Sequence, residues 1–98
     1  MTKLNLGHNN FIGSIPVSIG SLIDLAYFHL YNNKFFGKLP SSLENCKELM
    51  IIDIGENEFV GSIPSWLGHR LSRLMILSLR SNNFHGHIPK ELCALTSL

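Results

Sequence analysis

A single motif recurs four times in this chain of 98 residues, at an almost constant spacing. Each copy has the form Leu-x-Leu-x-x-Asn-x-Phe-x-Gly-x-(Ile/Leu)-Pro, with Phe or Ile replacing Leu in the second and third copies. The motif ends at Pro16, Pro40, Pro64 and Pro89, so its period is 24, 24 and 25 residues. A fixed period in the twenties indicates a solenoid, in which each unit packs only against its neighbours.

Within each unit, apolar and polar residues alternate before the asparagine, as in a strand with one buried face. We therefore expect parallel strands near residues 3–6, 27–30, 51–54 and 76–79. Each proline then fixes φ where the chain enters a return leg. The predicted fold is an α/β repeat, namely a leucine-rich-repeat solenoid with a parallel β-sheet on its concave face and short helical or 3₁₀ return legs.

Two further positions of the motif are expected to hold the turns. The asparagine amide can satisfy turn backbone groups that would otherwise be buried without partners, and the glycine four residues later permits tight backbone geometry. The expected asparagine ladder is Asn9, Asn33, Asn57 and Asn82, and the glycines are Gly13, Gly37, Gly61 and Gly86. The phenylalanines between them are expected to fill the back of the coil.

Composition and length exclude several classes of protein. The net charge is +1, so no basic excess suggests nucleic acid, and no apolar stretch approaches the roughly 18 residues of a membrane-spanning helix. The amino terminus has no apolar segment like that of a signal peptide. We expect one array over residues 1–98, uncapped at both ends and belonging to a longer protein, with units of about 1–24, 25–48, 49–73 and 74–98.

The outward strand positions contain the candidate ligand-binding residues. One expected column is Asn5, His29, Asp53 and Ser78, which includes the residue types of a hydrolase triad. Asp53 lies between the other two candidates, whereas the histidine of a triad must contact both partners, so we predict no catalytic residues. If the chain binds a ligand, we expect contacts on the concave face from Lys3, Asn5, His8, Tyr27, His29, Tyr31, Asp53, Glu56 and Arg80.

Several apolar residues also occupy outward strand positions. They include Tyr27, Tyr31, Met50, Ile51, Met75 and Ile76. Exposed apolar clusters often mark interaction sites, and tyrosine is favoured at interfaces. Lateral packing between neighbouring strands accounts for such residues equally well.

The remaining clusters support weaker hypotheses. His85 and His87 project from one side of an extended segment, but two ligands are too few for a zinc site, so we predict no metal and no cofactor. Cys46 and Cys93 lie two units apart, about 10 Å at the strand spacing, which is too far for the roughly 7 Å that a disulfide requires. His69, Arg70 and Arg73 form a small basic group, for which a solvated convex face is the favoured interpretation.

The Gly-x-(Ile/Leu)-Pro segments, GSIP at 13–16, GKLP at 37–40, GSIP at 61–64 and GHIP at 86–89, resemble the plant-specific class of leucine-rich repeat. Residues 64–98 and SSLENCKEL at 41–49 are similar to repeats of plant receptor-like proteins. The resemblance implies a second short strand at each Gly-x-(Ile/Leu)-Pro segment. It also implies a non-enzymatic module that binds a protein or peptide ligand in plant defence or signalling.

The same resemblance places the parent protein on the extracellular side of the plasma membrane. A partner receptor kinase would be engaged through regions outside this sequence. Two alternatives share the repeat class: a secreted inhibitor of a microbial cell-wall-degrading enzyme, and the ectodomain of a receptor kinase. Ectodomains of this group usually carry Asn-x-Ser/Thr sequons, and this chain has none. A transmembrane segment or a kinase domain further along the parent chain would distinguish these readings.

Overall fold

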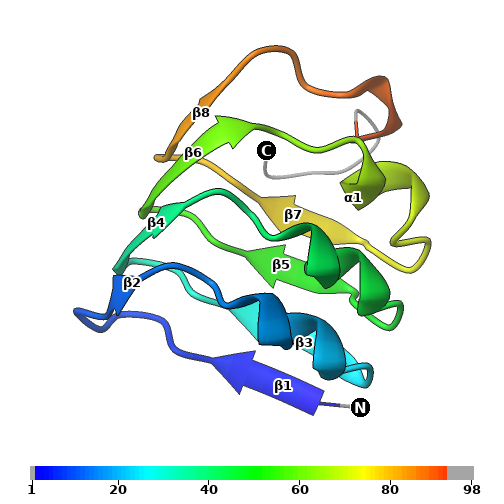
Figure 1. The fold of residues 1–98 in the computed structure, drawn as a ribbon, viewed down its shortest axis with the longest axis horizontal. Coiled ribbons are helices and arrows are strands. Elements are labelled where there is room, and N and C mark those ends of the chain that lie inside the picture. The colour runs from blue at the N-terminus through cyan, green and yellow to red at the C-terminus, as the bar shows by residue number, and fades with distance from the viewer. Residues whose placement is uncertain (1, 93–98) are drawn as a thin grey trace.

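The computed structural model describes residues 2–92, which form a stack of coils with a parallel sheet along one side (Figure 1). The sheet has the order β1-β3-β5-β7, and every pair of neighbours is parallel. Its strands are β1 (Thr2–Asn5), β3 (Leu25–His29), β5 (Ile51–Asp53) and β7 (Ile76–Ser78). The predicted fold class is confirmed, and each strand lies within two residues of its predicted bounds.

A second parallel sheet runs along another side of the stack, in the order β2-β4-β6-β8 (Figure 1). Its strands are β2 (Ile12–Gly13), β4 (Lys34–Gly37), β6 (Glu58–Ser62) and β8 (Asn83–His85). The resemblance implied strands at the Gly-x-(Ile/Leu)-Pro segments, but these strands lie further upstream, around the Phe-x-Gly residues. The proline that follows has no N–H to donate to a ladder, which favours ending the strand before it.

The return legs are short, as predicted, and each follows a motif proline. They are the 3₁₀ helices η1 (Val17–Ser21), η2 (Ser41–Asn45) and η3 (Lys90–Leu92), and the α-helix α1 (Trp66–His69). The unit with α1 is the one that contains the extra residue of the 25-residue period. One added residue therefore converts a 3₁₀ turn into an α-helical turn without disturbing the sheets.

Apolar side chains from both sheets and the return legs meet inside the coils. Phe59 is fully buried, and its ring stacks between those of Phe35 and Phe84 with centroids 6.4 Å apart on either side. Phe11, the equivalent residue in the first unit, is 45% exposed. The core is thus most complete in the middle units, where a coil packs on both sides.

The asparagines join each unit to the one before it. In the third unit, Asn57 Oδ1 accepts a hydrogen bond from the backbone N–H of Phe35 at 3.1 Å, and its Nδ2 donates to the Leu30 carbonyl at 2.9 Å. Asn33 and Asn82 make the same pair of contacts to their preceding units. Each amide therefore satisfies one donor and one acceptor that no strand partner reaches.

The motif glycines have backbone conformations that other residues rarely adopt. Gly37, Gly61 and Gly86 have φ of 85°, 94° and 85°, and Gly13 has φ of 144°.

Within residues 2–92, no helix is long and apolar enough to cross a membrane.

Candidate functional site

The first sheet aligns the outward side chains in columns. Hydrogen-bonded register pairs Asn5 with His29, His29 with Asp53, and Asp53 with Ser78, which confirms the predicted column. Parallel strands at about 4.8 Å spacing bring such side chains side by side. Asp53 lies between His29 and Ser78, so the geometry of a hydrolase triad is not formed.

Two members of this column also stabilise their own turns. Asn5 Oδ1 accepts a hydrogen bond from the N–H of Gly7 at 3.1 Å, and Asp53 Oδ1 accepts one from Gly55 at 3.3 Å. Sequence reasoning treated both side chains as free for a ligand. The signal that could have revealed the turns is an Asn or Asp two residues before a glycine, a pattern typical of Asx-turns.

A compact polar cluster lies where the strands end, and Tyr31 is at its centre. The Tyr31 hydroxyl donates a 2.5 Å hydrogen bond to Glu56. The His8 ring meets the Tyr31 ring edge-on, with centroids 5.2 Å apart, and His8 Nδ1 lies 3.2 Å from Nδ2 of Asn32. Three residues predicted as ligand contacts, from three successive units, are thus brought together.

The packing of Tyr31 depends on a glycine in the next unit. A side chain at Gly55 would place its Cβ 3.3 Å from Cδ1 and 3.4 Å from Cε1 of the tyrosine ring. Such contacts are tighter than ordinary van der Waals separation, so the ring lies on the glycine backbone. Gly55 therefore fixes where the phenol can lie, a role that the repeat motif does not reveal.

Electrostatic interactions in the cluster change mainly the pKa of the Tyr31 phenol. The hydrogen bond to the Glu56 carboxylate raises the pKa of Tyr31 above its ordinary value, and desolvation and the negative charge of Glu56 add to this. The positive charge of Arg80 opposes the shift. Arg80, Tyr31 and Glu56 therefore form one group of interacting charges and dipoles on the concave side.

The turn after each strand holds a non-glycine residue with positive φ. These residues are His8 at 57°, Asn32 at 60°, Glu56 at 52° and Ser81 at 60°. The left-handed conformation costs most residues about 1–2 kcal/mol, so the surrounding hydrogen bonds must hold it. Because the backbone turns here, His8 and Glu56 lie in a column next to that of Tyr31 and Arg80.

Apart from Tyr31, the apolar residues predicted to face outward lie where the strands of this sheet begin. Met75 is 59% exposed and Ile76 is 38% exposed, whereas Tyr27, Met50 and Ile51 are half-buried. Register pairs Lys3 with Tyr27, Tyr27 with Ile51, and Ile51 with Ile76. The concave face thus changes from apolar where the strands begin to charged where they end.

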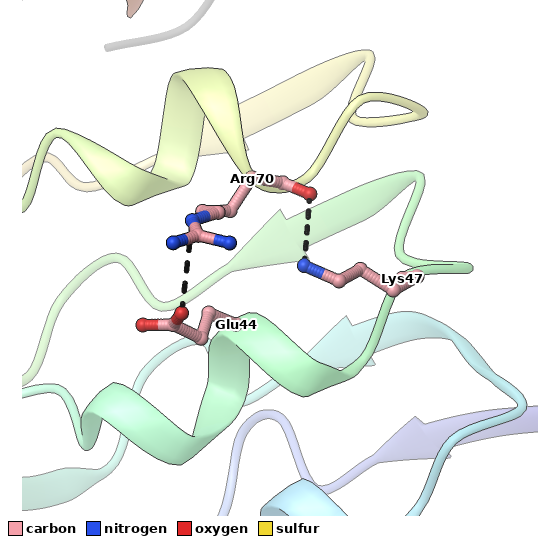
Figure 2. Close-up of polar contacts among 3 residues, drawn as sticks. All are labelled: Glu44, Lys47 and Arg70. Carbon is pink, nitrogen blue, oxygen red and sulfur yellow. Dashed lines mark hydrogen bonds and ion pairs between the residues drawn. The ribbon is translucent and has the colours of Figure 1, made fainter.

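Two residues of the basic group predicted in the return legs, Arg70 and Arg73, are paired with acidic residues. Arg70 Nε lies 3.9 Å from a Glu44 carboxylate oxygen, and Lys47 Nζ donates to the Arg70 carbonyl at 3.4 Å (Figure 2). Arg73 pairs with Glu48 at 3.1 Å. These contacts link successive return legs, which agrees with the solvated convex face favoured from sequence.

The remaining candidates from the sequence are the possible metal ligands and the two cysteines. There is no group of three or more His, Cys, Asp or Glu side chains there that could hold a metal ion. Cys46 is fully buried, its thiol donates to the Ile19 carbonyl at 3.4 Å, and burial raises its pKa. Cys93 lies outside the described residues, so the predicted absence of a Cys46–Cys93 disulfide is not tested.

Comparison with known proteins identifies the class to which these units belong. The model of the Leucine Rich Repeat family matches residues 1–22, 24–46 and 73–95, which is more than half of the chain. The chain therefore belongs to the leucine-rich repeat family. No curated protein sequence matches it.

Several solved plant receptor structures are similar to this chain. It is 38% identical to the leucine-rich-repeat ectodomain of the Arabidopsis thaliana receptor kinase GASSHO1/SCHENGEN3, solved with CASPARIAN STRIP INTEGRITY FACTOR 2, over 90% of this chain and 10% of that one, with a TM-score of 0.84. A chain of the Arabidopsis BIR3–SERK2 complex is 43% identical over 90% of this chain and 47% of that one, with a TM-score of 0.85.

The Arabidopsis BIR2 ectodomain is 30% identical, over 94% of this chain and 48% of that one, with a TM-score of 0.89. This chain thus spans from a tenth to about half of the length of these solved proteins. The resemblance to plant leucine-rich-repeat receptors made from sequence is confirmed.

Proposed function

We propose that this chain is a ligand-binding part of a plant cell-surface receptor, and that its concave face carries the contact surface. The contact residues are those predicted from sequence: Lys3, Asn5, His8, Tyr27, His29, Tyr31, Asp53, Glu56 and Arg80. The ligand is a protein or a peptide, and a partner receptor kinase acts through regions of the parent outside this sequence. The module itself performs no chemical reaction.

The observation that supports this proposal most directly is the cluster around Tyr31. Its hydroxyl is tied to Glu56, and its ring rests on Gly55 and against His8. A tyrosine held in this way loses little conformational entropy on binding, which is why such side chains often dominate interface energetics. Arg80 and Glu56 provide opposite charges close by, which orient a partner.

The convex face offers less for recognition. Arg70 and Arg73 already have acidic partners in the preceding return leg, so a ligand anion must compete with these contacts. On the concave face, neither Lys3 nor Arg80 belongs to an ion pair among the described residues. This difference favours the concave face as the site for a charged ligand.

The receptor assignment is favoured over a secreted inhibitor because the similar solved proteins include receptor ectodomains. GASSHO1/SCHENGEN3 is a membrane receptor kinase solved with CASPARIAN STRIP INTEGRITY FACTOR 2, and BIR3–SERK2 is a complex of two proteins. By analogy, we place this chain on the extracellular side of the plasma membrane and expect a protein or peptide partner. A receptor-like protein and a receptor kinase ectodomain remain two forms of the same proposal.

The test works with an unidentified ligand, because peptides selected in the laboratory serve as probes. A phage library of random 12-residue peptides would be selected against the 98-residue chain, and the affinity of the enriched peptides measured for the chain and for two variants. The concave variant carries Tyr31→Ala, Asp53→Ala and Arg80→Ala. The convex control carries Lys47→Ala and Arg73→Ala, and circular dichroism would confirm that both variants fold.

The concave variant is expected to bind the enriched peptides at least about tenfold more weakly, which corresponds to about 1.4 kcal/mol. The convex control is expected to bind them as the unmodified chain does. Peptides that lose affinity for the convex control, but retain it for the concave variant, would show that recognition occurs on the other face.

A further inference from the structure

An apolar stripe on the second sheet points away from the core. Ile12, Phe36 and Val60 occupy the same motif position in three successive units and are 71%, 47% and 41% exposed. Their neighbours Phe35 and Phe59 point into the coils instead, as the alternation of a strand requires. Side chains at solvated strand positions are usually polar, so three exposed apolar residues in successive units form an unexpected surface.

Two charged residues lie on opposite sides of this stripe. Hydrogen-bonded register places Glu58 directly across from Phe36. Lys38 follows two residues after Phe36, and its side-chain carbons lie 3.2–3.7 Å from the position of a Cβ on Gly61, next to Val60. The four residues therefore form a parallelogram. Phe36 and Val60 occupy one diagonal, and Lys38 and Glu58 occupy the other.

The two charges are available for another molecule. Lys38 and Glu58 are both exposed, and neither forms an ion pair within residues 2–92. The arginines of the return legs are different, because Arg70 and Arg73 each have an acidic partner in their own chain. The flank of the second sheet thus combines exposed apolar surface with one unpaired charge of each sign.

This arrangement is complementary to itself. A two-fold axis along the Phe36–Val60 diagonal superposes the apolar stripe on that of a second copy and brings each charged corner close to the oppositely charged corner of the other copy. Glu58 of each copy then faces Lys38 of the other, which gives two reciprocal ion pairs. Isologous contacts of this kind are the commonest way in which identical chains associate.

We propose that the flank formed by Ile12, Phe36, Lys38, Glu58 and Val60 is the interface of a homodimer of this chain. The contact is small, at the low end of the range for specific interfaces, below about 1,200 Å². The dimer is therefore weak and forms at about 10 µM or above. It lies on the second sheet and leaves the first sheet free, so it is independent of the proposed ligand site.

The test measures self-association of the 98-residue chain by sedimentation equilibrium over a range of concentrations. Lys38→Glu and Glu58→Lys, each alone, replace two attractions per dimer by two repulsions and are expected to raise the dissociation constant about tenfold or more. The double variant, Lys38→Glu with Glu58→Lys, restores opposite charges and is expected to return the constant to within about threefold of its original value.

Lys34→Glu is the matched control, because it makes the same charge change as Lys38→Glu four residues earlier, at the start of β4. Lys34 lies across from Ile12 in the register, and the two-fold axis brings it close to the uncharged Ser14 of the other copy. It is expected to leave the dissociation constant nearly unchanged, whereas Phe36→Ser weakens the dimer. Met75→Ser removes a similarly exposed apolar side chain from the other sheet and serves as the control for Phe36→Ser.

Recovery of the dimer in the double variant would support the interface, because loss of folding cannot explain it. The proposal is overturned if the chain stays monomeric up to about 500 µM. It is equally overturned if association does not respond to either single charge reversal, or if the double variant associates no better than the single ones. Association through strand edges or the ends of the solenoid would not respond to the charge reversals, because Lys38 and Glu58 lie outside such contacts.

Discussion

Replacing Asn57 by alanine tests whether the asparagine ladder holds successive units together. The Asn57 side chain is 7% exposed and makes four hydrogen bonds to backbone groups. Two of these cross to the preceding unit, from the Phe35 N–H and to the Leu30 carbonyl. In Asn57→Ala the Phe35 N–H loses its partner inside the stack, whereas the Leu30 carbonyl keeps the hydrogen bond from Asn33 Nδ2 at 3.0 Å.

The expected cost follows from the one group left unsatisfied. A buried donor or acceptor without a partner costs about 1–3 kcal/mol, so we expect Asn57→Ala to lose about 1–3 kcal/mol, mainly from the Phe35 N–H. Urea unfolding monitored by circular dichroism measures this loss as a lower transition midpoint at an unchanged slope. The matched control is Asn9→Ala. Asn9 is exposed and bonds only to the Leu6 and Gly7 carbonyls of its own unit, so we expect a loss of less than about 1 kcal/mol.

Asn57→Asp distinguishes the contribution of the amide oxygen from that of the amide nitrogen. The aspartate can still accept from the Phe35 N–H, but its second oxygen faces the carbonyls of Leu30, Ile54 and Gly55, which are also acceptors. Repulsion raises the pKa of this carboxylate in the folded state, so the damage is largest at neutral pH and decreases as the pH falls through that pKa. If Asn57→Ala cost no more than Asn9→Ala, the ladder would be a consequence of stacking rather than a cause.

Three further results are expected. Phe59→Ala should cost about 3–5 kcal/mol in urea unfolding, because the ring is fully buried between two others. Phe11→Ala should cost much less, and equal losses would contradict the role of two-sided packing. Gly61→Ala should cost about 1–2 kcal/mol, since φ is 94° and the new Cβ lies 3.2 Å from Cγ of Lys38; no loss would show that the backbone of β6 relaxes at this position. Burial raises the folded-state pKa of Cys46 above the ordinary 9.0. The neutral thiol therefore adds stability that is lost as the pH rises above 9, and unfolding of Cys46→Ala should lack this component.

The first sheet was predictable because one spacing repeats through the whole chain. Alternation of Leu4, Phe28, Ile52 and Leu77 with polar residues defined both the strands and their columns, and the register follows that alignment. Asparagine at every strand end gave the ladder, since a turn backbone needs both a donor and an acceptor. Features that each unit repeats are thus accessible from sequence.

Features that depend on contacts between residues outside the repeated motif could not be predicted from the sequence. The hydrogen bond from Tyr31 to Glu56 requires a left-handed turn at Glu56 and a glycine at position 55, and no motif specifies that combination. The second sheet also differs from expectation. Its register pairs Ile12 with Lys34 and Phe36 with Glu58, an offset of 22 residues, rather than the 24 of the first sheet. The path of the turn between the two strands of each unit accounts for this difference of two residues.

The α-helical turn α1 has a consequence for how arrays of this kind vary in length. Across this turn, the register of the first sheet changes to an offset of 25 residues, as in Ile51 with Ile76, and that of the second sheet changes to 23, as in Val60 with Asn83. Both sheets advance by the same single residue, so their surfaces remain aligned with each other. Units of unequal length can therefore be joined, exchanged or extended at the return leg while the surfaces of the two sheets keep their geometry.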